Sequence, residues 1–141
     1  MSLYEKLLIA SPTIFNLEPV LFAYLYGSHA KGLMHPFSDV DIAIYSELKD
    51  LDAIYRLEMN IGLSMDAHLD HSVSTDVRSL TLLPIAVVGE VLTYGRLIYS
   101  RDEASRVDFE VSARKRYFDF RPALQNYYHQ ALDKMRGRHG F

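Results

Sequence analysis

Apolar residues recur along this chain at the two spacings that distinguish strands from helices. The run PVLFAYLY is almost wholly apolar and aromatic and stops at Gly27, which is typical of a buried strand. The run DVDIAIY alternates instead, so its branched apolar residues point to one face of a strand and Asp39, Asp41 and Ala43 to the other. The strands predicted in this way lie at 19–26, 39–45, within 72–80 and at 96–100.

Helices are predicted where apolar residues return every three or four positions. Ser2 and Glu5 have the spacing of a capping box, in which a serine side chain accepts a hydrogen bond from the first turn of a helix. Ser100 and Glu103 repeat this spacing, and no glycine follows for most of the remaining chain. That region is therefore expected to be helical, with an interruption at Pro122. The predicted helices span 3–10, 48–64, 84–94 and the region after 100.

The order of these elements predicts an α+β fold, in which helices pack on a small mixed sheet. A chain of 141 residues is expected to form one domain, here 1–141, with a C-terminal helical segment at 100–141. Apolar residues recur at helical spacing inside that segment and are expected to belong to the core. They are Leu124, Tyr128, Ala131 and Met135.

Composition and charge exclude several classes of protein. The chain has no cysteine, which excludes disulfides and thiolate metal sites and fits a reducing compartment. No signal peptide is expected, and no stretch is apolar over the ~18 residues of a membrane span. Residues 111–141 hold seven Lys/Arg and two Asp, a local charge of +5, whereas the rest of the chain carries −8. This basic tail is either a solvated helix face or a contact surface for phosphates or an acidic partner.

Two carboxylates stand where a buried strand would favour valine. Asp39 and Asp41 are two residues apart, so both side chains leave the same face of the predicted strand. Two carboxylates so close repel each other, and a divalent cation removes that repulsion. Mg²⁺ commonly takes one or two carboxylates together with substrate phosphates. The pair therefore predicts a magnesium site that works on a phosphorylated substrate.

The turn before these carboxylates is suited to phosphate. Gly27 and Ser28 follow a predicted strand, where glycine allows backbone N–H groups to approach phosphate oxygens closely and serine adds a hydroxyl. Lys31 is close enough in sequence to reach the same phosphates as a point charge. One strand end is thus expected to hold phosphates while the next holds their metal.

The segment GSHAKGLMHPFSDVDIAIY resembles the signature of the minimal nucleotidyltransferases of the DNA polymerase β-like superfamily. It resembles most the antitoxins of HEPN/MNT toxin–antitoxin pairs, whose toxin is a HEPN-domain RNase. The resemblance is tight over 25–45 and looser further on. It implies a palm-like sheet and Mg²⁺-dependent transfer of AMP from ATP, with two metal ions expected. It also implies a cytoplasmic hetero-oligomer with the toxin, whose hydroxyl, expected to be a tyrosine, accepts the AMP.

Site residues carry over from the resemblance by position. Gly27 and Ser28 match the phosphate-binding pair, and Asp39 and Asp41 match the metal-binding pair. The family often has arginine where this chain has Lys31. Lysine keeps the positive charge but cannot form the bidentate hydrogen bonds that arginine makes with phosphate.

The family uses a third acidic residue on a later, neighbouring strand. Asp76 in STDVRSL is the residue chosen here as a third catalytic and metal-binding carboxylate, because the apolar alternation around it turns its side chain away from the core. Asp66 and Asp70 are the rivals, and both fall in a polar connection. The sequence of this strand is less apolar than the family's usual run, with Thr75 before the aspartate and Arg78 two residues after it.

Three other functions compete with protein modification. The first is transfer of a nucleotide to a small molecule, for which a second domain or subunit would have to complete the pocket. The second is a non-catalytic antitoxin that acts by binding alone, but a decayed site is not expected to keep a charged pair that costs stability without metal. The third is stable nucleic-acid binding, which rests only on the basic tail and is opposed by the net charge of −3.

Overall fold

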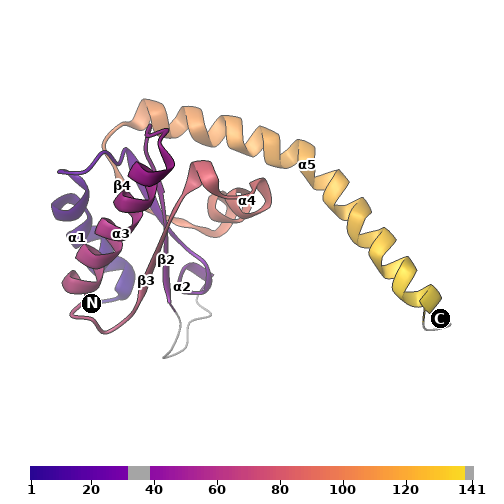
Figure 1. Ribbon diagram of the computed structural model, residues 1–141, viewed down its shortest axis with the longest axis horizontal. Coiled ribbons are helices and arrows are strands. Elements are labelled where there is room, and N and C mark those ends of the chain that lie inside the picture. Colours follow the sequence, from indigo (N-terminus) through magenta and orange to yellow (C-terminus); the bar gives the residue numbers. More distant parts are fainter. Residues whose placement is uncertain (32–38, 139–141) are drawn as a thin grey trace.

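A computed structural model describes residues 1–31 and 39–138 of the chain. The predicted α+β class, with a mixed sheet and a C-terminal helix, is confirmed. Figure 1 shows helices around the sheet and α5 passing over it before leading away. The elements are α1 (Leu3–Phe15), β1 (Phe22–Tyr26), α2 (Ser28–Lys31), β2 (Val40–Tyr45), α3 (Leu51–His68), β3 (Thr75–Ser79), the 3₁₀ helix η1 (Leu80–Leu82), α4 (Ile85–Tyr94), β4 (Arg96–Ser100) and α5 (Glu103–Arg138).

The four strands form one sheet in the order β3-β2-β1-β4. β1 is antiparallel to β2 and to β4, whereas β2 and β3 run parallel. A parallel pair needs a crossover connection, which α3 supplies. The end of β1 therefore lies beside the beginnings of β2 and β3, and this edge of the sheet gathers the residues discussed below.

The alternation along the strands divides the core into two parts, one on each face of the sheet. The first part packs under α1 and α3, and the second under α4 and the beginning of α5. The branched residues of β2 lie in the first part and Ala43 lies in the second, as the alternation predicts. Asp41, two residues before Ala43, accordingly belongs to the face that α4 covers.

Helix α1 extends beyond its predicted end. Ser2 accepts a hydrogen bond from the Glu5 backbone N–H at 3.2 Å, so the predicted cap is present. The helix continues to Phe15 with Pro12 inside it. Ile14 and Phe15 are buried in the first core, and their packing favours continuation of the helix past the proline.

The predicted interruption at Pro122 is wrong. α5 is one helix from Glu103 to Arg138 with Pro122 inside it. A proline removes one backbone hydrogen bond and bends a helix, but the turns on either side can still form. Figure 1 shows that α5 bends along its length.

The N-terminal cap of α5 also differs from the expected one. Asp102, and not Ser100, accepts a hydrogen bond from the Ser105 backbone N–H, at 3.0 Å.

The prediction that the apolar stripe of this helix belongs to the core is also wrong. Tyr128 is 58% exposed and Met135 55% exposed, and neither belongs to the two cores. The spacing correctly identifies one helix face, but spacing alone does not say what covers that face. Within residues 1–31 and 39–138, no helix is long and apolar enough to cross a membrane.

Gly89 sets how closely α4 and α5 approach. A Cβ atom at this position would lie 2.2 Å from Cδ2 of Tyr117 on α5. Gly89→Ala is therefore expected to lower the free energy of unfolding by about 1–3 kcal/mol, because the Tyr117 ring would have to move. Urea denaturation measures this change.

Gly62 on α3 provides the matched control for Gly89. A Cβ atom there would be 3.7 Å from its nearest neighbours, an ordinary contact. Gly62→Ala is thus expected to be neutral or to stabilise the protein by up to about 1 kcal/mol through helix propensity. A Gly89→Ala variant at least as stable as the unmodified chain would contradict the tight α4–α5 contact.

Candidate functional site

A row of three polar side chains crosses the sheet at the edge where β1 ends and β2 and β3 begin. Tyr26 is the register partner of Asp41, and Asp41 is the register partner of Asp76. Register partners on neighbouring strands point to the same face of a sheet. A phenol and two carboxylates therefore stand side by side on the face that α4 covers.

Gly27 closes one side of this row. Its φ angle is +73°, a conformation that favours glycine, and a Cβ atom there would lie 2.3 Å from Oδ2 of Asp41. The Asp41 carboxylate consequently lies directly against the backbone of the turn. This contact brings together the predicted phosphate turn and one predicted metal ligand.

The other predicted residues lie around this contact. Asp39 is exposed and immediately precedes β2. It is two residues before Asp41, so the period of the strand places both residues on the same face. Ser28 begins α2 directly after Gly27, and Lys31 is the last residue of that helix. The Lys31 side chain lies outside the described part of the structure.

Asp76 has a partner on its own strand. Nε of Arg78 is 3.1 Å from Oδ1 of Asp76, and both side chains are well exposed, at 58% and 43%. An exposed ion pair of this kind contributes little to stability, typically ~0–1 kcal/mol. The pair can thus open at small cost when another ligand approaches Asp76.

The two rival carboxylates are placed differently. Oδ1 of Asp66, on α3, accepts a hydrogen bond from the Thr75 backbone N–H at 2.9 Å. Asp70 lies in the turn after α3 with a positive φ of 55°. Neither is on a strand beside β2, whereas Asp76 is the register partner of Asp41.

The carboxylates do not form a complete metal site by themselves. Among the described residues, no group of three or more His, Cys, Asp or Glu side chains is gathered closely enough to hold a metal ion. The donor chemistry nevertheless fits Mg²⁺, which binds through one or two carboxylates and takes phosphate oxygens and water as its remaining ligands. Asp39, Asp41 and Asp76 are the residues that would hold it together with a nucleotide.

Tyr26 belongs to this site, although no pattern in the sequence had singled it out. Burial, and then the carboxylates of Asp41 and Asp76, raise the pKa of the Tyr26 phenol from 10.0 to about 12. The phenol is therefore protonated at neutral pH and can donate a hydrogen bond. Its position directly before Gly27 was the available signal in the sequence.

The raised pKa of Tyr26 has a consequence for stability in alkali. Between pH 10 and 12 the folded chain keeps the Tyr26 proton that the unfolded chain releases, so the free energy of unfolding falls as the pH rises through this window. Tyr26→Phe is expected to make that fall shallower. Urea denaturation at several pH values measures the slope, and equal slopes in both proteins would contradict this environment for Tyr26.

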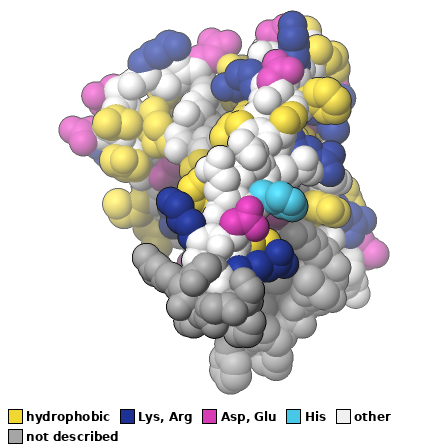
Figure 2. Space-filling view, turned by 90° about the vertical axis from the view of Figure 1, so that its right-hand side faces the viewer, with side chains coloured by type: hydrophobic (Ala, Val, Ile, Leu, Met, Phe, Trp, Pro, Cys, Tyr) yellow, Lys and Arg dark blue, Asp and Glu magenta, His cyan; other side chains and the backbone are white. Residues whose placement is uncertain are grey.

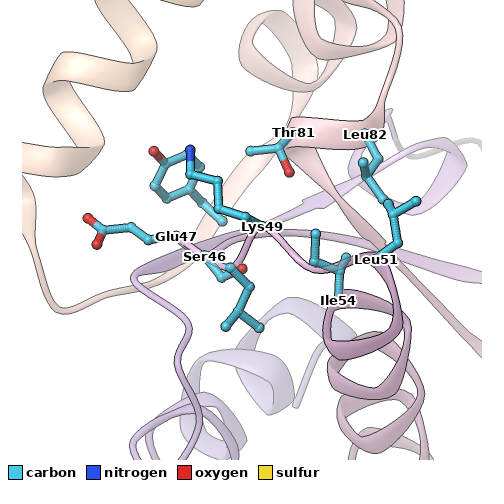
Figure 3. A pocket seen from close by; sticks show the side chains of 9 residues that line it. Ser46, Glu47, Lys49, Leu51, Ile54, Thr81 and Leu82 are labelled. Carbon is cyan, nitrogen blue, oxygen red and sulfur yellow. The ribbon is translucent and has the colours of Figure 1, made fainter.

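A wider pocket lies at the opposite end of β2. It has a volume of about 530 Å³, and Lys49, Thr81 and Leu82 are among its lining residues (Figure 3). Only one carboxylate, that of Glu47, lines it. Size alone would favour this pocket, but the paired carboxylates and the glycine turn lie at the other edge of the sheet, and we place the candidate site there.

Comparison with known proteins agrees with this geometry. The family model described as polymerase beta, nucleotidyltransferase matches residues 11–104, more than half of the chain. No curated protein matched the chain.

Several solved structures with the same fold come from toxin–antitoxin systems. A chain of a MntA-HpeT mutant complex is 19% identical with a TM-score of 0.68, covering 90% of this chain and 98% of that one. A chain of a toxin–antitoxin complex with AMP-PNP is 19% identical with a TM-score of 0.63, covering 95% and 98%. A chain from the complex between tri-AMPylated Shewanella oneidensis HEPN toxin and MNT antitoxin is 16% identical with a TM-score of 0.66. The match covers 92% of this chain and 99% of that one. At such identities the likeness shows the fold.

Proposed function

The chain belongs to the polymerase beta nucleotidyltransferase family, and from that premise we propose that it is an antitoxin that transfers AMP from ATP to a HEPN-domain RNase toxin. The observation that carries the proposal is the contact between Gly27 and Asp41, within the row that Asp76 completes. The similar structures support it, since one contains AMP-PNP and another a tri-AMPylated HEPN toxin. The proposed activity uses ATP and is expected in the cytoplasm.

Each residue of the site has a proposed part in the transfer. Gly27 and Ser28 hold the phosphates, for which Gly27 leaves room and Ser28 provides a hydroxyl. Asp39, Asp41 and Asp76 would hold Mg²⁺, which would neutralise phosphate charge and support in-line displacement. Two Mg²⁺ ions are proposed, as the resemblance implies.

The reaction itself is a displacement at the α-phosphorus of ATP. The acceptor oxygen, expected to be that of a tyrosine, forms a bond to this phosphorus while the bond to the bridging oxygen of the β-phosphate breaks, and pyrophosphate leaves. The proton of the acceptor hydroxyl passes to the Asp76 carboxylate, whose exposed ion pair with Arg78 opens at small cost. AMP on the toxin adds bulk and negative charge that oppose the binding of RNA phosphates.

Calorimetric titration tests the nucleotide and metal part of this proposal. Because the described carboxylates form no complete metal site, Mg²⁺ alone is expected to bind weakly, while ATP with Mg²⁺ binds measurably. ATP that bound equally well with and without Mg²⁺ would contradict the proposed role of the carboxylates.

The outer part of α5 has features that support the proposal of a protein partner. Exposed apolar side chains follow this part of the helix, namely Phe118, Tyr127, Tyr128, Leu132 and Met135. Tyr128, Leu132 and Met135 are spaced as one helix face. Figure 2 looks onto the side where α5 ends and shows hydrophobic side chains beside Lys and Arg. We propose that the HEPN toxin covers this face, and the basic residues among the apolar ones favour an acidic counterpart.

Disruption of this face is expected to weaken the complex. The double variant Tyr128→Asp with Leu132→Asp should lower affinity for the HEPN toxin at least about 30-fold, the effect of losing one interface hot spot. Calorimetry with purified toxin measures the affinity. Ile9→Asp is the control, because Ile9 is 65% exposed on α1, and α1 packs on the other face of the sheet from α4 and α5. Equal affinity in the double variant and the control would place the interface elsewhere.

A further inference from the structure

A small pocket lies between the end of β1 and helix α4, next to the row of polar side chains. Its volume is about 230 Å³. Gly27 lines this pocket and also touches the Asp41 carboxylate, so the pocket opens directly beside the candidate site. The residues that line it are Tyr26, Gly27, Ala86, Val87, Glu90 and Tyr94.

The chemistry of the pocket suits an uncharged aromatic group. Ala86 and Val87 give it aliphatic walls, and Tyr26 and Tyr94 contribute two phenol rings. Among the lining residues that the structure describes, Glu90 is the one ionisable side chain besides these phenols, so these residues bring no positive charge to hold a phosphate. A flat ring can pack on the tyrosines, and Glu90 can accept a hydrogen bond from an amino group on that ring.

The order of residues across the sheet separates the nucleotide from the acceptor. Asp76 is on β3, Asp41 on β2 and Tyr26 on β1, and α4 packs over the β1 end of this row. In an in-line displacement the acceptor approaches from the side opposite to the departing pyrophosphate. Because Gly27 and Ser28 hold the phosphates and Asp76 takes the proton of the acceptor, the acceptor approaches from the side of Asp76. The pocket that includes Gly27 is then left for the nucleotide.

We propose that this pocket binds the nucleobase of the substrate and that Glu90 determines nucleotide choice. The base packs against Tyr94, and the Glu90 carboxylate accepts a hydrogen bond from the exocyclic amino group of adenine. The triphosphate remains at Gly27 and the carboxylates. This inference rests on the proposed function and adds to it the residues that select the nucleotide.

A fluorescence measurement tests the location of the base. The chain has no tryptophan, so Tyr94→Trp introduces a single tryptophan into the pocket, whose emission can be excited apart from that of the tyrosines. With Mg²⁺, ATP is expected to change its emission in a saturable way, whereas inorganic tripolyphosphate, which has no base, is not. Leu17→Trp, at a position 91% exposed, is the matched control and should respond to neither.

The outcomes separate this inference from the proposed function. If calorimetry shows that ATP binds while the emission of Tyr94→Trp stays constant, or changes equally with tripolyphosphate, the pocket assignment is overturned and the proposed function stands. If neither ATP nor tripolyphosphate binds at all, the proposed function fails, and the inference fails with it.

A second variant tests the choice of nucleotide. Inosine triphosphate carries a keto oxygen where ATP carries the amino group, and a carboxylate cannot donate to that oxygen. The unmodified protein should therefore bind ATP more tightly than inosine triphosphate. Glutamine can accept from the amino group and can also donate to the keto oxygen, so Glu90→Gln should narrow the ratio of the two affinities about tenfold, the equivalent of about one hydrogen bond. Since Glu90 is exposed, the variant is expected to fold. An unchanged ratio of the two affinities would overturn the role of Glu90.

Discussion

Asp41→Asn is expected to lower nucleotidyl transfer at least about 100-fold, more than the usual cost of losing a residue that merely supports a metal ligand. Asp41 is central in the row, with Tyr26 on one side and Asp76 on the other, and it lies against Gly27. Asparagine has nearly the same shape, so it fits against Gly27 but lacks the charge that attracts Mg²⁺. Release of pyrophosphate from ATP measures the rate in the presence of the toxin.

The control for Asp41→Asn removes the same charge elsewhere. Asp52 is exposed in the first turn of α3 and belongs to no part of the candidate site. Asp52→Asn should transfer at the rate of the unmodified protein, and circular dichroism should show the same helix content for all three proteins. An Asp41→Asn variant within a few-fold of the unmodified rate would remove Asp41 from the metal site.

Gly27→Ala is the second substitution expected to have a large effect. The added Cβ atom would lie 2.3 Å from Oδ2 of Asp41, so the carboxylate would have to leave its position. The φ of +73° adds a backbone cost of about 1–2 kcal/mol for a residue with a side chain. Binding of ATP with Mg²⁺ should consequently be lost in a calorimetric titration, and the protein should be less stable in urea.

A second variant separates these two causes. Asparagine tolerates the left-handed conformation better than alanine but also has a Cβ atom. Gly27→Asn should thus recover part of the stability and none of the ATP binding. Full ATP binding in Gly27→Asn would show that the close approach to Asp41 is not required.

The sequence alone was sufficient for the parts of the site that depend on local geometry. The period of two along 39–45 places Asp39 and Asp41 on one strand face whatever the rest of the fold, and the structure has that strand at Val40–Tyr45. Gly27 was selected because a tight turn needs glycine, and its positive φ agrees with that reason. The roles of these residues in catalysis remain predictions.

The parts that depend on packing between distant segments could not be derived in the same way. The pairing of Asp41 with Asp76 is a register between β2 and β3, two strands that helix α3 separates in the sequence, and no local pattern encodes it. The pocket beside Gly27 exists because α4 crosses the end of β1, and the sequence indicates α4 without indicating its place. Tyr26 and Glu90 were missed for this reason.

Helix α5 shows a third limit, in which a correct pattern supported an incorrect conclusion. The spacing of Leu124, Tyr128 and Met135 marks an apolar face, yet two of these three residues are more than half exposed. A repeat along one helix cannot distinguish a core contact from a contact with another protein. We infer that this face is occupied by the toxin, in keeping with the proposed function.

The central claim is that this chain modifies its toxin, and the mass of the intact toxin tests it most directly. The toxin is incubated with the antitoxin, ATP and Mg²⁺, and its mass is measured beside its RNase activity, with the Asp41→Asn antitoxin in parallel. The account predicts that the toxin gains mass in steps of one AMP residue and loses RNase activity, and that Asp41→Asn abolishes the gain. A toxin that is fully inhibited while its mass stays unchanged would contradict the account and favour inhibition by binding alone.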